Sequence, residues 1–166
     1  MELGKEYRPE AVAYPWDMVL QRPDTGPQPL PREKRMIELY DENLGELLIL
    51  GAPGSGKTTL LLDLCRDLVK RAETEETHPI PVVFNLSSWA QKRLPLSEWI
   101  VEELLRRYDI PRTVGAQWVE SAHLLLLLDG LDEVSLQHRA ACIEAVNRYR
   151  ENHTRSEERR VGKECL

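Results

Sequence analysis

A glycine-rich segment that follows an apolar run carries the residues with the most specific chemistry in this sequence. It reads Gly51-Ala-Pro-Gly-Ser-Gly-Lys-Thr58 and fits the spacing Gly-x-x-x-x-Gly-Lys-[Ser/Thr] in full. Glycines at these positions let the backbone turn tightly, and successive backbone N–H groups then point at one anion. The helix expected to begin near Lys57 adds the positive end of its dipole. The segment therefore predicts a phosphate-binding loop.

Each polar residue of this loop has its own predicted role. Lys57 is expected to bridge the β- and γ-phosphate oxygens of a nucleotide, and the Thr58 hydroxyl is expected to bind Mg²⁺. Thr59 is expected either to pack in the helix or to contact the α-phosphate. The predicted nucleotide-binding residues are Gly51, Ala52, Pro53, Gly54, Ser55, Gly56, Lys57, Thr58 and Thr59.

A run of five leucines, 124–128, ends in an acidic residue, Asp129. Such an uninterrupted apolar run is typical of a strand that is buried on both faces. Ligands of parallel sheets bind beyond the carboxyl ends of the strands, so we expect residues 51–58 and 129–133 to converge there. Asp129 is accordingly the predicted magnesium residue, acting directly or through water.

Two further acids compete for the role of the catalytic base. Glu133 is the first choice for orienting or deprotonating an attacking water, because it lies just past the strand end, and Asp132 is the alternative. An acid at the start of a helix is also favoured by the helix dipole alone, so a purely structural role stays open for both. With Lys57, these two acids form the candidate catalytic set.

The elements that must position these residues alternate between strands and helices. Strands are predicted at 46–50, 81–86 and 124–128, and helices at 33–43, 57–71, 96–108, 114–122 and 136–150. This alternation predicts an α/β fold with a parallel sheet and crossover helices. Residues 85–89 are interpreted mainly as a strand end and packing turn, with a contribution to the nucleotide site as the alternative.

The two ends of the chain differ from its middle. Six prolines in residues 1–32 predict an extended lead-in, and residues 33–154 are the predicted NTPase domain, which is expected to be partial. Residues 155–165 resemble the translation of a common sequencing adapter in one reading frame, so 155–166 is interpreted as a non-native tail.

The composition argues against nucleic acid and membranes as direct partners, and against a metal site built from cysteines. The net charge of −6 is not typical of a dedicated nucleic-acid binder. The three cysteines lie far apart and predict neither a metal site nor a disulfide framework. The longest apolar run, 124–128, is far shorter than the ~20 residues that span a bilayer. We expect a cytoplasmic protein that contacts neither nucleic acid nor membrane directly.

Three motifs in this order resemble the bacterial NACHT-domain proteins of the STAND class of P-loop NTPases. They are the loop 51–59, the segment Ile80-Pro-Val-Val-Phe-Asn-Leu-Ser-Ser-Trp89 and the segment Leu127-Leu-Asp-Gly-Leu-Asp-Glu-Val134. The resemblance covers about residues 14–152, and its most discriminating part is the Asp-Gly-Leu-Asp-Glu signature at 129–133.

The resemblance implies a regulatory switch that binds ATP or dATP with Mg²⁺ and hydrolyses it slowly. In the full-length protein it implies self-association through the NTPase domain, in signalling that often serves defence. It also implies a three-layer αβα P-loop fold that is incomplete at the C-terminus, because one sheet strand would follow residue 154.

The residues leave three alternative functions open: a GTPase, a small-molecule kinase and a scaffold that binds nucleotide. A GTPase would carry Asp-x-x-Gly where 129–132 reads Asp-Gly-Leu-Asp, and a small-molecule kinase would carry an arginine-rich lid loop. A scaffold that binds nucleotide without turnover would share the whole loop. Lys57, Thr58, Asp129 and Glu133 together favour hydrolysis over such a scaffold.

Overall fold

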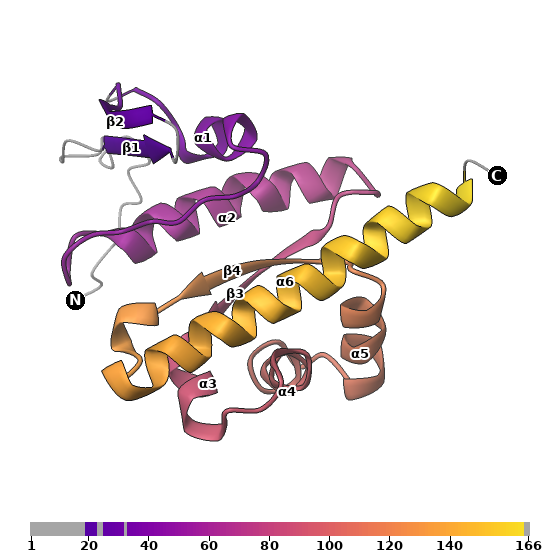
Figure 1. Ribbon diagram of the computed structural model, residues 1–166. Helices are drawn as coiled ribbons and strands as arrows, with labels where there is room; N and C mark the ends of the chain where they lie inside the picture. Colours follow the sequence, from indigo (N-terminus) through magenta and orange to yellow (C-terminus); the bar gives the residue numbers. More distant parts are fainter. Residues whose placement is uncertain (1–18, 23–24, 32, 165–166) are drawn as a thin grey trace, which may run out of the picture. The chain divides into compact units, whose positions relative to one another are not determined.

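The computed structural model describes residues 19–22, 25–31 and 33–164, drawn in colour in Figure 1. The chain forms two compact units, Met1–Leu48 and Ile49–Leu166. The candidate residues 51–59 and 129–133 all belong to the second unit.

The first unit contains a hairpin and a short helix. Strands β1, Val19–Arg22, and β2, Thr25–Pro29, pair antiparallel, and helix α1, Met36–Glu42, buries three apolar residues. Within the predicted extended lead-in, 1–32, the described residues thus include a paired hairpin that the sequence did not predict. The predicted helix at 33–43 is confirmed within shorter bounds. Proline is compatible with β2 because each strand of a two-stranded ribbon has a free edge, where a missing N–H breaks no ladder bond.

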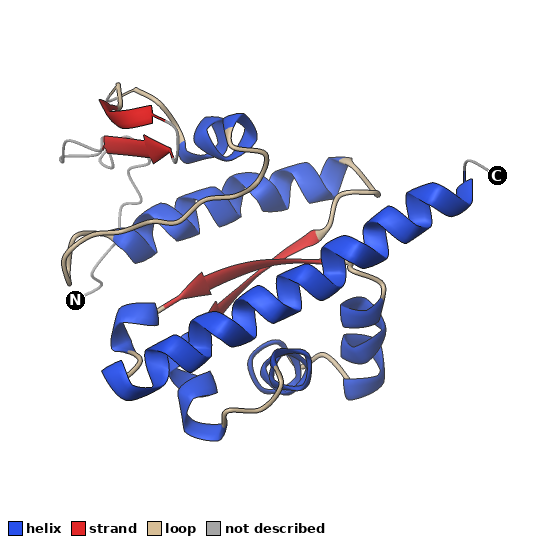
Figure 2. Ribbon diagram, viewed as in Figure 1, coloured by secondary structure: helices blue, strands red, loops and turns tan. Residues whose placement is uncertain are grey.

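The second unit alternates helices with strands, as the sequence predicts (Figure 2). Its elements are α2, Lys57–Thr74; β3, Ile80–Asn85; α3, Leu86–Lys92; α4, Leu96–Tyr108; α5, Arg112–Glu120; β4, Leu124–Asp129; the 3₁₀ turn η2, Leu131–Glu133; and α6, Leu136–Glu164. The expected packing turn after β3 is a helix, α3, which begins directly at the strand end.

Strands β3 and β4 pair in parallel, and their register runs from Ile80 opposite Leu124 to Asn85 opposite Asp129. Helix α2 covers one face of this sheet, and α3 to α6 lie on the other side (Figure 1). The predicted α/β fold class is confirmed, with helix layers on both sides of a parallel sheet. The register also places the ends of both strands at the same edge.

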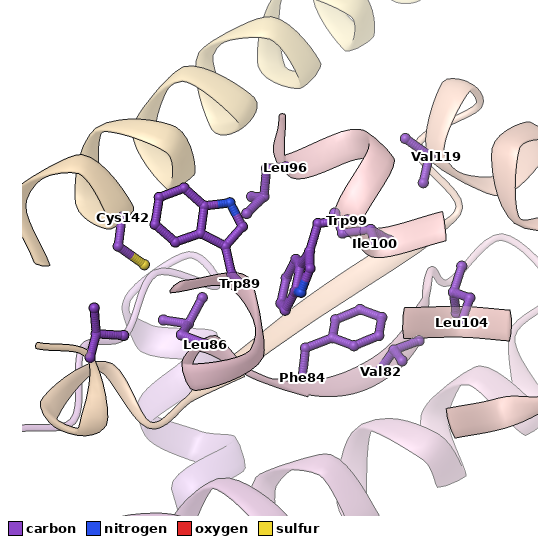
Figure 3. Packing of buried hydrophobic residues seen from close by; sticks show 11 residues of the cluster. Val82, Phe84, Leu86, Trp89, Leu96, Trp99, Ile100, Leu104, Val119 and Cys142 are labelled. Atoms are coloured by element: carbon purple, nitrogen blue, oxygen red, sulfur yellow. The ribbon is translucent and has the colours of Figure 1, made fainter. Parts of the chain in front are cut away.

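The main hydrophobic core lies between β3 and the helices α3 to α6 (Figure 3). Alternate residues of β3 point toward it, and Phe84 at the strand end is fully buried. The Phe84 ring lies 5.4 Å from the Trp99 ring on α4, centroid to centroid, in a tilted pair. Aromatic pairs of this kind add packing energy beyond the area they bury, so they hold the end of β3 firmly against α4.

The predicted strand at 46–50 is wrong. These residues form no strand, and the side chains of Leu48 and Leu50 are 74% and 79% exposed. A strand is stabilised by a ladder of hydrogen bonds to a neighbour, and the parallel sheet of the described residues consists of β3 and β4 alone. For the same reason β4 is only half-buried, with Leu127 as its one buried residue, although its sequence predicts burial on both faces.

Truncation of the core aromatic at the end of β3 tests this packing. We expect Phe84→Ala to lower the free energy of unfolding by about 3–5 kcal/mol, because it removes a fully buried ring and leaves a cavity. Urea denaturation measures the change. Leu62→Ala on α2 is the control, since that side chain is 52% exposed and its loss is expected to cost no more than about 0.5 kcal/mol. Equal losses for the two variants would contradict this account of the core.

Candidate functional site

The loop ahead of α2 has the backbone conformation that its glycines predict. Gly54 and Gly56 have φ of +76° and +83°, a region that other residues adopt only at a cost. A Cβ atom at Gly51 would lie 2.5 Å from the Ser55 hydroxyl oxygen. Ser55 N–H donates to the Ala52 carbonyl and closes the turn around Pro53. The backbone of the loop therefore favours glycine at 54 and 56, and a side chain at 51 would require the Ser55 hydroxyl to move.

Lys57, the first residue of α2, folds its side chain back over the loop. Its Nζ donates to the carbonyls of Gly51 and Ala52, each at 3.0 Å, and lies 3.1 Å from Asp132 Oδ2. The Lys57 side chain is 18% exposed, so its ammonium is largely surrounded by these oxygens. The hydrogen bond from Lys57 lowers the pKa of the Asp132 carboxyl, and backbone hydrogen bonding lowers it further.

Thr58 links α2 to the end of β4. Its hydroxyl donates to Asp129 Oδ2 at 2.8 Å, while Asp129 Oδ1 accepts the backbone N–H of Gly130 at 2.8 Å. The phosphate loop and the acidic strand end thus meet, as the sequence predicts. Thr59 is exposed in the first turn of α2, one residue further along.

The two acids after Asp129 lie in the η2 turn and have different partners. Asp132 pairs with Lys57, whereas Glu133 Oε2 accepts a hydrogen bond from Asn85 Nδ2 at 3.2 Å. Both acids are exposed. The structure therefore gives different partners to Glu133, the first choice from sequence, and to Asp132, the alternative.

Two residues outside the predicted site, Arg139 and Asn85, contact this turn. Arg139 on α6 donates from Nη2 to the carbonyls of Asp132 and Val134, at 3.0 and 3.1 Å. Asn85 was assigned mainly to packing, yet its side chain reaches Glu133. The signal for Asn85 was its place at the carboxyl end of a strand, since parallel strands end at the same edge. No sequence pattern pointed to Arg139.

The oxygens at this edge suit a magnesium ion. Mg²⁺ prefers hard oxygen ligands, keeps several waters and is usually bound by one or two protein groups together with substrate phosphates. The Thr58 hydroxyl and the Asp129 carboxylate, already within hydrogen-bond distance of each other, supply two such groups beside the loop. When bound, the ion supplies charge that neutralises developing negative charge on phosphate oxygens.

An α/β fold that carries a glycine-rich loop ahead of α2 and an acid at the end of β4 is typical of the P-loop NTPases. The chain belongs to the NACHT domain family, whose family model matches residues 46–161, more than two thirds of the chain. No curated protein and no solved structure matches the chain. The family consists of nucleotide-binding NTPase modules of STAND-type proteins, which generally bind nucleotide with Mg²⁺.

Within the residues that the structure describes, no helix has both the length and the apolar character needed to cross a membrane.

The Lys57–Asp132 pair makes a prediction about pH. Because the pKa of Asp132 is lower in the folded chain than its unfolded value of about 3.9, the pair stabilises the fold above that value. Its contribution is lost as the pH falls through the lowered pKa. Carboxyl ¹³C shifts of Asp132, followed against pH, are expected to titrate at higher pH in Lys57→Ala than in the wild-type chain. Lys70→Ala, on the same helix, is the control, and identical titrations in all three chains would contradict the pairing.

Proposed function

We propose that this chain is the nucleotide-binding module of a NACHT-type signalling switch, and that it binds ATP or dATP with Mg²⁺ and hydrolyses it slowly. The observation that carries the proposal is the hydrogen bond from Thr58 to Asp129 at 2.8 Å. It brings the hydroxyl of the glycine-rich loop to the acid at the end of β4, from elements far apart in sequence. A phosphate-bound magnesium ion needs ligands from both elements.

The loop residues have proposed roles in binding. Backbone N–H groups of residues 51–58 other than Pro53, together with the dipole of α2, are suited to the phosphates of the nucleotide. Lys57 is proposed to transfer its ammonium from Asp132 and the loop carbonyls to the β- and γ-phosphate oxygens. Thr58 and Asp129 are the proposed residues that would hold Mg²⁺.

Glu133 is the proposed catalytic base. In hydrolysis the oxygen of a water bonds to the γ-phosphorus while the bond to the β–γ bridging oxygen breaks, and Glu133 accepts the proton of the water. The choice of Glu133 over Asp132 is supported by its partner, because Asn85 at the end of β3 holds the Glu133 carboxylate. Lys57, the partner of Asp132, is instead proposed to move to the phosphates. Glu133 accepts only the neutral amide of Asn85 among the hydrogen bonds described here.

The proposed nucleotide binding is tested with a fluorescent ATP analogue in the presence of Mg²⁺, with ATP or GTP as competitor. We expect Lys57→Ala to weaken binding at least about tenfold, because charge-assisted hydrogen bonds of this kind contribute about 1.5–3 kcal/mol. Lys70→Ala, at an exposed position of the same helix, is the matched control. Binding that does not depend on Lys57 would refute the loop assignment, and stronger competition by GTP would favour a GTPase.

The proposed hydrolysis, with Glu133 as its base, is tested by measuring phosphate release from ATP. We expect Glu133→Gln to retain nucleotide binding and to lower kcat by about 10²–10⁴-fold, the usual contribution of a general base. Asp132→Asn is the matched variant, one residue away on the same turn. A larger loss of kcat in Asp132→Asn would transfer the base role to Asp132. Tight, Lys57-dependent binding without any wild-type turnover would favour a nucleotide-binding scaffold.

The proposal extends to the full-length protein, which we propose is cytoplasmic and self-associates through this domain when the nucleotide state changes. Residues 33–154 are the part assigned to nucleotide handling, with 1–32 as a lead-in and 155–166 as a non-native tail. Light scattering of the full-length protein with and without ATP tests the association.

A further inference from the structure

The side chain of Asn85 lies where three parts of the candidate site meet. Asn85 is the last residue of β3 and stands opposite Asp129 in the register of the parallel sheet. Its amide contacts the start of α3 on one side and the η2 turn on the other. These contacts place it beside the proposed catalytic base rather than in the core, which contains its neighbours Phe84 and Leu86.

The orientation of the Asn85 amide is determined by its neighbours. Its Oδ1 accepts the backbone N–H of Ser87 at 2.8 Å and the Ser87 hydroxyl at 2.5 Å. A backbone N–H can only donate, so the atom facing it must be the oxygen. The NH₂ group therefore faces Glu133 and donates to its Oε2 at 3.2 Å. Ser87 thus determines which end of the amide the proposed base meets.

Gly130 leaves the space in which this amide lies. A Cβ atom at Gly130 would stand 2.9 Å from both Nδ2 and Oδ1 of Asn85, so a side chain at this position would require the Asn85 amide to move. Gly130 also has a φ of +75°, which favours glycine on conformational grounds. The glycine that follows Asp129 therefore admits the Asn85 side chain between β4 and the η2 turn.

The backbone of the η2 turn is held from the opposite side. Arg139 binds the carbonyls of Asp132 and Val134, which flank Glu133. With the backbone held in this way, the position of the Glu133 carboxylate depends on its own side-chain rotations. A glutamate loses considerable rotational freedom when it is ordered, so a hydrogen bond to its carboxylate decides where the group spends its time.

We propose that Asn85 is a positioning residue for hydrolysis, which acts by donating a hydrogen bond that holds the Glu133 carboxylate in place for the attacking water. The inference rests on the proposed function, because it assigns Asn85 a role through Glu133. A base that is misplaced by about 1 Å can lose about 10²-fold in rate. Asn85 contacts no phosphate-loop residue in the hydrogen bonds described, so its effect falls on turnover rather than on nucleotide binding.

Asn85→Asp is the discriminating variant. Asp has nearly the same shape and is as good an N-cap as Asn, so it keeps the acceptor for Ser87 and the start of α3. It loses the donor to Glu133 and sets a second carboxylate against it, which repels the base. We expect kcat to fall at least about tenfold, the equivalent of losing a hydrogen bond to a charged group, while KM and the affinity for the ATP analogue change less than about twofold.

Asn85→Ala separates this effect from the structural role of Asn85. It removes the cap and the donor together, so we expect a lower melting temperature as well as a lower kcat. For Asn85→Asp we expect the melting temperature of the wild-type chain. If Asn85→Asp hydrolyses ATP at the wild-type rate, Asn85 is a helix cap only and the inference is overturned. A large loss of nucleotide affinity in Asn85→Asp would overturn it too, by making Asn85 a binding residue.

The side-chain amide of Asn85 provides a readout that needs no turnover. In ¹⁵N–¹H NMR spectra of the whole chain, its cross-peaks are identified by their loss in Asn85→Asp. We expect them to shift in Glu133→Gln and to stay in place in Glu144→Gln, an exposed acid on α6. Cross-peaks that do not respond to Glu133→Gln overturn the inference even if the chain hydrolyses ATP. Absence of Lys57-dependent hydrolysis in the wild-type chain refutes the proposed function instead, and with it the role of Asn85.

Discussion

The parallel, in-register pairing of β3 and β4 is the constraint on which the candidate site depends. It sets Asn85 opposite Asp129, so that the polar residues after both strands gather at one edge of the sheet. The start of α2 reaches the same edge through the bond from Thr58 to Asp129. A shift of one residue in this register would turn every side chain of the strand to the other face. The hydrophobic alternation of β3 fixes the register of the strand, and the register in turn sets the positions of the polar residues at the sheet edge.

The polar groups at this edge largely satisfy one another. The Lys57 ammonium has three oxygen partners, and the Asp129 carboxylate accepts bonds at both of its oxygens. On the proposed function, a nucleotide that enters the loop replaces the contact between Lys57 and Asp132. Its affinity is then the difference between two sets of charge-assisted contacts, and Asp132 lowers that difference by competing with the phosphates for the same ammonium.

The core and the site are joined within a few residues. Phe84 is buried against Trp99, and the next residue, Asn85, contacts Glu133. The indole N–H of Trp99 donates to the hydroxyl of Ser88, which itself donates to the Asn85 carbonyl. Packing of α4 against β3 thus fixes the backbone from which the Asn85 side chain extends. Rigid support of this kind is what a site needs if small displacements are to matter for its chemistry.

The sequence by itself determined the conformation of the glycine-rich loop, the alternation of strands with helices and the α/β class, because these follow from local conformational preference and from periodicity. It did not predict the hairpin β1–β2, and it assigned a strand to 46–50 from apolar character alone. A strand also needs a partner, which only the tertiary structure supplies or withholds. The same holds for the acids: Asp132 and Glu133 are adjacent and alike in sequence. Only the folded chain, by bringing Lys57 to Asp132 and Asn85 to Glu133, gave them different surroundings.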